Sequence, residues 1–417
     1  MGLLLVTATG ICSMMGASIN VIPFMIQKNV PGIGPYVVPA FLFAAIPAIF
    51  AAYAYAILSS AMPRAGGSYL YASRGLSPYL GFIASFSQWF GLSIVIGVIS
   101  YIIVPFIRDV FFNLGFINIS DFLEVGSVRL TISLLLIWFF VLINIVGGKV
   151  YKNTLIPMLV IMFVLGSIVL ITGLVYDQND FINSVLNSEN RVIKPISDIK
   201  FDLKIFLTAA TLMFSSFIGF DAIAQTGNEA KNPTKNIPRA ILLAIFIVAS
   251  YYILFTISVY NIVPWSFVAD ESITKDITAP GLLSYVLPPF WGILIIIGAA
   301  IALINDLPAM ILSVSRLMFA WAKDNIFPNR VALIHSKFNT PYIAIILVGV
   351  VASIGAIGSH FAGDFFLGID IMVTSMMINF LLMCVTLISI QKVNFKLFKN
   401  ITVIKNRAIQ LFIGYTG

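Results

Sequence analysis

The sequence has little charge and few metal-binding side chains. Only 10% of its 417 residues are Asp, Glu, Lys or Arg, against about 25% in an average soluble protein. Its two cysteines, Cys12 and Cys384, stand far apart in apolar stretches, so they predict neither a disulfide framework nor a Cys-x-x-Cys metal site. With His335 and His360 as the two histidines, a histidine-based metal centre is not expected either. These shortages exclude a soluble domain and predict no metal site.

Long apolar runs take up most of the chain instead. Hydrophobic residues make up 60% of it, and the mean hydropathy is +1.02. A helix needs about 20 apolar residues to cross a bilayer. The sequence predicts ten such spans, near 3–25, 36–61, 79–107, 128–147, 154–176, 203–226, 238–263, 287–318, 341–359 and 367–391. Because the runs are continuous rather than alternating, they favour an all-α membrane protein over a β-barrel.

The basic residues gather in alternate loops. Most of the 24 Lys and Arg residues lie on one side of the predicted membrane, together with the N-terminus. Loops rich in Lys and Arg stay in the cytoplasm, so we expect a multi-pass protein of the cell membrane with a cytoplasmic N-terminus. The same rule explains the net charge of +7 without a nucleic-acid partner.

Two spans are interrupted near their middles by small and polar residues. The first contains Gly10, Gly16 and Asn20, and the sixth contains Ser215 and Gly219. Glycine weakens a helix by about 1 kcal/mol relative to alanine. If ten spans divide as five plus five, these two are the first helices of two repeats with opposite orientation. Broken helices at matching positions of inverted repeats indicate a transporter binding site, although small residues also serve close helix packing.

This division predicts four segments. They are a first five-helix repeat at 1–176, an extracellular loop at 177–202, a second five-helix repeat at 203–391, and a basic cytoplasmic segment at 392–417 that leads toward the position of a further span.

Three stretches then resemble a known family, the amino acid–polyamine–organocation transporters. They are Phe217-Ile218-Gly219-Phe220-Asp221-Ala222 continuing through Asn228-Glu229-Ala230-Lys231-Asn232-Pro233, then Pro63-Arg64-Ala65-Gly66-Gly67-Ser68-Tyr69, and Ser315-Arg316-Leu317 with Ala322-Lys323-Asp324. The resemblance implies two inverted five-helix repeats of the 5+5, LeuT-like kind, alternating access, and an amino acid or related amine as substrate. In the first span this chain has Gly16-Ala17-Ser18-Ile19-Asn20, with Ser18 and Asn20 where the family usually has a glycine and an aromatic residue.

Broken helices expose backbone N–H groups that attract anions and carbonyls that attract cations. We therefore expect a substrate carboxylate at the backbone of Gly16, Ala17 and Ser18, with its amino group near the sixth span. The remaining substrate-binding candidates are Asn20, Phe214, Ser215, Phe217, Gly219 and Asp221. Phe217 and Phe220 are candidates for a gate, with ordinary aromatic packing as the alternative.

Three acids, Asp221, Asp306 and Asp370, lie at predicted membrane depth. Placing an ionised carboxylate there costs free energy, so an acid at this depth usually has a function. Asn305 and Asp306 are our candidates for the coupling ion, H⁺ or Na⁺, by resemblance to the region where span eight packs near span one. A hydrogen-bonded aspartate that stabilises helix contacts is the alternative.

On the cytoplasmic side, Glu229, Arg239 and Arg316 are candidates for ion pairs that stabilise one conformation, with solvated loop charge as the plainer reading.

The sequence contains no P-loop and no HExxH motif, so we expect neither an enzyme nor a cofactor. We predict a secondary active transporter of a small molecule. The alternatives are a cation-coupled transporter of a polyamine or nucleobase, an antiporter, and, from another class, a channel or a non-transporting sensor. The sequence leaves the oligomeric state open.

Overall fold

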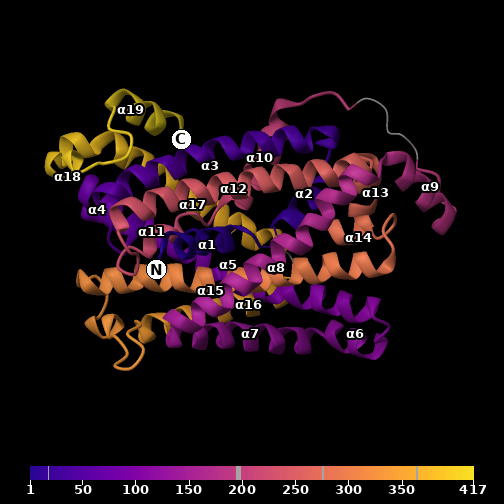
Figure 1. Cartoon of the computed structure of the whole chain (residues 1–417), viewed down its shortest axis with the longest axis horizontal. Helices are drawn as coiled ribbons and strands as arrows, with labels where there is room; N and C mark the ends of the chain where they lie inside the picture. Colours follow the sequence, from indigo (N-terminus) through magenta and orange to yellow (C-terminus); the bar gives the residue numbers. More distant parts are fainter. Residues whose placement is uncertain (17, 194–198, 275–276, 363–364) are drawn as a thin grey trace.

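The chain is described by a computed structural model that covers residues 1–16, 18–193, 199–274, 277–362 and 365–417. Within these ranges every regular element is a helix. Among the described residues, ten helical segments are long and apolar enough to cross a membrane, which agrees with the number of spans expected from the sequence. Figure 1 shows them running side by side along the longest axis of the molecule.

The spans follow one another in chain order. They are α1 and α2 (Leu3–Met14, Ser18–Asn29), α3 (Val37–Ala61), α5 (Pro78–Asn113), α7 (Gly126–Val146), α8 (Gly148–Val175), α10 with α11 (Leu203–Phe214, Ala222–Gln225), α12 (Pro233–Ile262), α15 (Pro289–Lys323), α16 (Tyr342–Ala362) and α17 (Phe365–Val393). A short turn of 3-10 helix, η1 (Gly34–Tyr36), precedes α3.

Short helices cover the two ends of the bundle. One end, called the basic end here, carries α4 (Gly67–Gly75), η3 (Asn329–Ala332) and α18 (Phe395–Lys399). The opposite end carries α6 (Ile117–Glu124), α9 (Gln178–Glu189), α13 (Trp265–Thr274) and α14 (Ala279–Leu283). The last helix, α19 (Arg407–Thr416), packs on α17 and α3.

The segment predicted as a loop at 177–202 contains the helix α9. Asp177 and Asp180 form a capping box at its start, in which each carboxylate accepts a hydrogen bond from the other residue's backbone N–H. This pairing satisfies N–H groups that the first helical turn otherwise leaves without partners. The division of the chain into two repeats stays a prediction.

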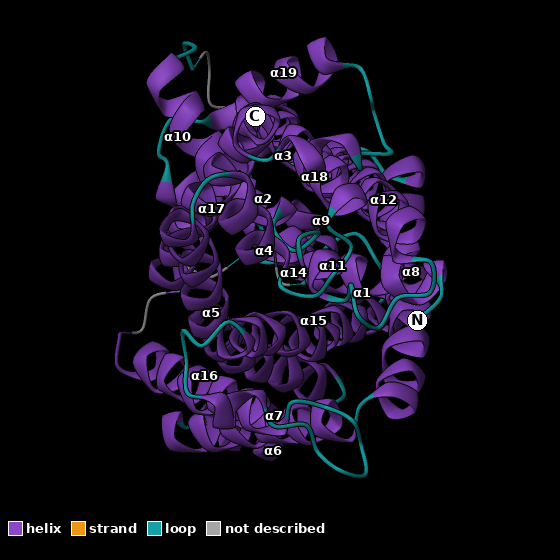
Figure 2. Cartoon of the chain, turned by 90° about the vertical axis from the view of Figure 1, so that its left-hand side faces the viewer, coloured by secondary structure: helices purple, strands orange, loops and turns teal. Residues whose placement is uncertain are grey.

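The core of the bundle is built around α5 and α15. These two helices pack on each other, and α5 also packs on α16 and α17. Viewed from the basic end, α7 and α16 lie on one side of the bundle, and α3 and α19 on the opposite side (Figure 2). Large apolar side chains such as Leu135, Phe139 and Phe246 stay exposed on the outer helices. Such an apolar outer surface is suited to contact with lipid. In lipid, the backbone polar groups of each span must form their hydrogen bonds within the helix. With its apolar surface and its long apolar helices, the chain is a multi-pass membrane protein.

The first and sixth spans are not continuous α-helices in the described residues. In the first, α1 ends at Met14 and α2 begins at Ser18. In the sixth, α10 ends at Phe214, a 3-10 turn (η2, Ser215–Phe217) follows, and α11 starts only at Ala222. Gly219 lies between these helices with a φ angle of +132°, a conformation that favours glycine. These bounds place non-helical backbone deep inside the bundle.

Candidate functional site

The two interruptions touch each other at Gly219. A Cβ atom added to Gly219 would lie 2.2 Å from the carbonyl oxygen of Ser13 and 2.9 Å from the backbone nitrogen of Met14. Real Cβ atoms do not approach other atoms so closely, and backbone atoms have little freedom to move. The contact therefore requires glycine, both for its φ angle and for the space.

A tyrosine of α12 stabilises the end of α1. The hydroxyl of Tyr252 donates a hydrogen bond of 2.7 Å to the carbonyl oxygen of Met14, the last residue of α1. Tyr252 is fully buried. A buried carbonyl at a helix end needs such a partner, because water does not reach it freely.

A small cavity of about 40 Å³ lies between the interruptions. Ser13, Met14 and Gly16 line it from the first span, and Ser215 and Ile218 line it from the sixth. The rest of the wall comes from α2, α5, α15 and α17, through Ile22, Val95, Val98, Ile99, Asp306, Met310, Ile369 and Met372. A buried water needs about 10–15 Å³ of such space, so this cavity has room for a few waters, and the site must expand to admit an amino acid.

Asp306 supplies the one carboxyl group in the wall of this cavity. It lies in α15, two residues before Pro308, and is buried. A Cβ atom added to Gly16 would be 2.4 Å from Oδ2 of Asp306, so the carboxyl group lies directly against the Gly16 backbone. Its other oxygen, Oδ1, has no hydrogen-bond partner among the described residues. The described residues that line the cavity include no Lys, Arg or His.

Asn305 and Asn20 are placed elsewhere. The Nδ2 group of Asn305 lies 3.0 Å from the sulfur of Cys12 in α1. Asn20 lines a second cavity, of about 20 Å³, on the side of Gly16 that faces Met162 of α8 and Tyr251 of α12. The structure therefore does not bring Asn20 to the cavity that holds Asp306.

Asp221 is buried but does not line the cavity between the interruptions. The amide of Gln88, from α5, donates a hydrogen bond to its Oδ2, and the Gly219 N–H donates one of 3.1 Å to its Oδ1. Ser68 of α4 in turn donates to the Gln88 carbonyl oxygen. This arrangement ties the interruption in the sixth span to α5 and α4, and a contact of Asp221 with substrate stays a prediction.

Phe217 and Phe220 pack in separate aromatic groups on either side of Gly219. Phe217 lies with its ring centroid 5.2 Å from that of Phe41, and Phe220 lies 5.1 Å from Phe380. Both are buried, and neither lines the cavity with Asp306. Phe214 borders a different space, an apolar cavity of about 370 Å³ between α3, α10 and α17.

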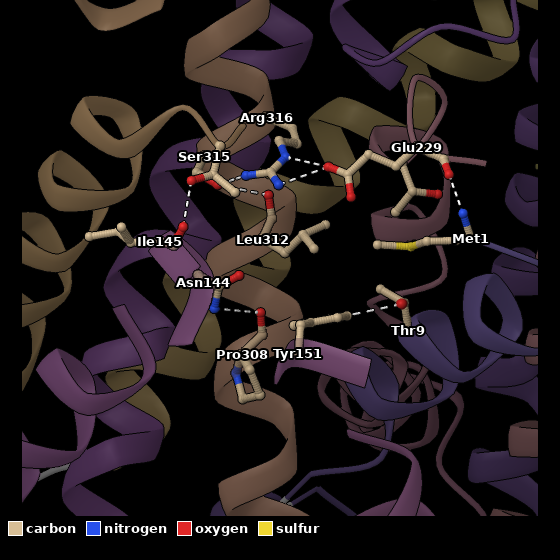
Figure 3. A network of polar contacts seen from close by, with 12 residues as sticks. Met1, Thr9, Asn144, Ile145, Tyr151, Glu229, Pro308, Leu312, Ser315 and Arg316 are labelled. Carbon is tan, nitrogen blue, oxygen red and sulfur yellow. Dashed lines mark hydrogen bonds and ion pairs between the residues drawn. The ribbon is translucent and has the colours of Figure 1, made fainter. Parts of the chain in front are cut away.

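At the basic end, Glu229 and Arg316 form an ion pair. Nε and Nη2 of Arg316 donate hydrogen bonds of 2.9 and 2.8 Å to Oε1 of Glu229. In Figure 3 the two side chains face each other, with Met1 next to Glu229 and Ser315 next to Arg316. The N–H of Lys231 donates a 2.7 Å hydrogen bond to the Met1 carbonyl. The loop after α11 is thereby held to α15 and to the start of α1.

Arg239 is not part of this group. It is exposed, on the same outward stripe of α12 as Leu243 and Phe246, and no ion pair of Arg239 occurs among the residues that the structure describes. The reason is its register, since a position on the outward stripe faces away from α15.

A second polar group at the basic end was not anticipated from the sequence. The hydroxyl of Tyr69 donates a 2.6 Å hydrogen bond to Asp324, and Arg74 lies 3.3 Å from the same carboxylate oxygen. Burial and the Asp324 carboxylate both raise the pKa of Tyr69, so the tyrosine stays protonated and donates. Both partners stand in the stretches that carry the family resemblance, but nothing in the sequence paired them.

Of the other predicted residues, Ala17 lies outside the described residues. Ser18 is described as the first residue of α2. The sequence also did not single out Tyr252, one of 15 tyrosines, because no local pattern reveals that its hydroxyl meets a carbonyl 238 residues away.

Comparison with known proteins gives several relatives that are transporters. The chain is 34% identical to an uncharacterized transporter of Mycobacterium tuberculosis over 152 residues, 36% of this chain and 33% of that protein. It is 28% identical to a branched-chain amino acid permease of Bacillus subtilis over 150 residues, 35% of this chain and 31% of the relative. It is also 28% identical to cationic amino acid transporter 4 of Mus musculus over 151 residues, 36% of this chain and 23% of that protein.

The matched region thus spans a third or less of each of these relatives. A family model covers far more of the chain. The model described as "Amino acid permease" matches residues 1–416. The chain therefore belongs to the amino acid permease family.

Proposed function

We propose that this protein is a secondary transporter that moves an amino acid, or a related amine, across the cell membrane by alternating access. The observation that carries the proposal is the cavity lined by Ser13, Met14 and Gly16 of the first span and by Ser215 and Ile218 of the sixth. Non-helical backbone at membrane depth is tolerated where it lines a binding site. The permease family and the relatives named for amino acids agree with this substrate class.

The backbone of the two spans supplies recognition of the substrate headgroup. The N-terminus of α2 at Ser18 follows Gly16, and helix N-termini attract anions such as a carboxylate. The C-terminus of α10 lies at Phe214, beside the cavity-lining Ser215, and helix C-termini attract an ammonium group. Backbone groups recognise what all α-amino acids share, so the apolar wall of Val95, Val98 and Ile369 would select among side chains.

Alternating access requires the basic end to open and close, and we assign this end to the cytoplasm because of its basic loops. The Glu229–Arg316 pair and the Asp324 group bridge separate elements there. A polar cavity of about 160 Å³ lies beside the pair, lined among others by Asn144, Tyr151 and Asn339. Opening toward the cytoplasm would break these contacts and join this cavity to the binding site. H⁺ or Na⁺ is the expected coupling ion.

Counterflow into proteoliposomes tests the proposal. Vesicles preloaded with one unlabelled compound are offered the same compound with a radioactive label, across a panel of amino acids, polyamines, nucleobases and methylthioribose. We expect saturable exchange of selected amino acids. If only a polyamine, a nucleobase or methylthioribose is exchanged, that compound, and not an amino acid, is the substrate. Flux that does not saturate would indicate a channel.

A matched pair of glycine variants tests the site. Gly16→Val places a branched side chain against Asp306, in the cavity wall, and should abolish exchange. Gly358→Ala is the control. Gly358 lies on α16, where an added Cβ meets no atom within 4 Å, so this variant should leave exchange unchanged. Exchange by Gly16→Val at the wild-type rate would refute this binding site.

A further inference from the structure

We propose that Asp306 makes the transporter proton-coupled, because its carboxyl group must be protonated before a substrate carboxylate can bind beside it at Gly16. The inference rests on the proposed function, and it selects the proton as the coupling ion and an amino acid with a free carboxylate as the substrate.

The first step is proximity. Oδ2 of Asp306 lies 2.4 Å from the position of a Cβ on Gly16, and both residues line one cavity of about 40 Å³. Gly16 lies two residues before Ser18, the first residue of α2, where the substrate carboxylate is expected to bind. The two carboxyl groups would thus share a space only a few ångströms across.

The second step is the absence of a compensating cation. Among the residues that the structure describes, the cavity wall has no Lys, Arg or His on α1, α2, α5, η2, α15 or α17. Three titratable side chains lie around the site. They are the Cys12 thiol of α1, which lies beside Asn305, the Tyr252 hydroxyl of α12, which donates to Met14, and Tyr251 of α12, which lines the second cavity at Gly16. Farther along the chain, Asp221 is held by Gln88 and Gly219, and Asp370 of α17 is exposed. Oδ1 of Asp306 has no hydrogen-bond partner among the described residues.

The third step is linkage. Like charges within about 4–6 Å disfavour each other's ionised form, and an apolar surrounding strengthens this effect. A substrate carboxylate therefore binds to the protein with protonated Asp306 and is repelled when Asp306 is ionised. Coupling between two ligands is reciprocal, so substrate binding also promotes proton uptake. Above the pKa of Asp306, the affinity should fall about tenfold for each unit of pH.

An amine without a carboxylate would behave in the opposite way. Ionised Asp306 attracts an ammonium group, so such a compound would bind better as the pH rises through the pKa of Asp306 and would release a proton. The sign of the proton change on binding therefore distinguishes a carboxylate beside Asp306 from an ammonium group beside it.

The decisive measurement is calorimetry of the purified full chain in sodium-free solution. The amino acid that gives counterflow is titrated at one pH in two buffers with different ionisation enthalpies, and the difference yields the protons taken up. We expect uptake of about one proton per substrate at a pH above the pKa of Asp306. No proton change, proton release, or binding only in the presence of Na⁺ would overturn the inference.

Asp306→Asn mimics the protonated side chain and supplies the variant test. It should bind substrate with an affinity independent of pH and take up no proton, and a proton gradient should no longer drive accumulation. Asp370→Asn, an exposed aspartate on the neighbouring α17, should keep wild-type proton uptake. Undiminished proton uptake by Asp306→Asn would overturn the assignment to this residue.

Two further observations keep the results separable. If Asp306→Asn does not fold, the sign of the proton change in the wild-type protein still decides the inference. If no amino acid binds the wild-type protein at all, the proposed function fails. If an amino acid binds without proton uptake, only the coupling mechanism fails.

Discussion

At the scale of single residues, the site depends on close approaches that exclude side chains. Gly219 contacts the backbone of Ser13, whereas Gly16 contacts the end of the Asp306 side chain. Backbone atoms cannot move away independently, but a carboxyl group can rotate. The two glycines of the interruptions should therefore differ in their tolerance to substitution.

Gly219→Ala should destabilise the protein strongly. A left-handed φ costs a non-glycine residue about 1–2 kcal/mol, and overpacking a close contact adds about 1–3 kcal/mol, so we expect a loss of about 2–5 kcal/mol and a clear drop in the thermal unfolding temperature in detergent. Gly358→Ala, which has open space and lies near the C-terminal end of α16, should be neutral or slightly stabilising. Equal stability of the two variants would contradict the Gly219–Ser13 contact.

Tyr252→Phe should weaken both the fold and the binding site. The change removes one of the two hydrogen bonds to the buried Met14 carbonyl, which still accepts one of 3.2 Å from the Gly16 N–H. We expect a cost of about 0.5–1.5 kcal/mol and a looser end of α1 where substrate binds. Tyr285→Phe removes an exposed hydrogen bond to Glu189 and serves as the control. Thermal unfolding and counterflow should both change in the first variant only, and a wild-type result for Tyr252→Phe would show that this hydrogen bond does not stabilise the end of α1.

At the scale of elements, one face of α1 packs in a small cluster apart from the main core. Leu5, Ala8 and Cys12 form a small separate cluster with Tyr151 and Leu155 of α8 and with Ala309 and Leu312 of α15. The Glu229–Arg316 pair and the Lys231–Met1 hydrogen bond close the same region at the basic end. A small cluster with few contacts separates at lower cost than the main core, so we expect this face of α1 to leave α8 and α15 if the basic end opens as alternating access requires.

Arg316→Ala should expose Cys12. Cys12 is buried against α8 and α15, and it becomes the only cysteine when Cys384 is replaced by serine. Arg316 is buried, whereas the side chain of Glu229 is 35% exposed. Losing the pair should favour a conformation open at the basic end and speed maleimide labelling of Cys12 several-fold. In the control Arg239→Ala, which lies on the outward stripe of α12, Cys12 should be labelled at the same rate as in the Cys384→Ser protein without a further change. Equal rates in the two variants would mean that the ion pair does not close the path.

At the scale of the whole molecule, the bundle has an apolar waist and two polar ends of different charge. Arg64, Arg74, Lys231 and Arg316 lie at or near the basic end, whereas Asp177, Asp180 and Glu189 lie around α9 at the opposite end. Because positively charged loops remain in the cytoplasm, this asymmetry fixes the expected orientation of all ten spans.

Single-cysteine labelling checks this orientation. With both native cysteines replaced, Lys235→Cys reports on the basic end and Ser188→Cys on α9, and both positions are exposed. A membrane-impermeant maleimide added to intact cells should label Ser188→Cys and should label Lys235→Cys only after lysis. The reverse pattern would place the N-terminus outside.

The sequence by itself determined the number of spans, their helical character and the family. Hydropathy is a sum over neighbouring residues, so the sequence alone reveals each span. A run of about 20 apolar residues in lipid has few ways other than a helix to pair its backbone N–H and C=O groups. The interruptions were also visible locally, because Gly219 and Ser215 weaken a helix wherever it packs. The helix α9 was missed because its capping box is polar and short, and hydropathy does not detect it.

Only the tertiary structure distinguished the two buried aspartates. Asp221 and Asp306 look alike in the sequence, each an acid within an apolar span, yet Gln88 and Gly219 hold one while the other lies in the cavity against Gly16. The partner of Arg316 and the role of Tyr252 were likewise set by packing, through contacts between residues 87 and 238 positions apart. Which side chain faces a cavity depends on the rotation and contact of several helices at once, and no local pattern in a sequence encodes that.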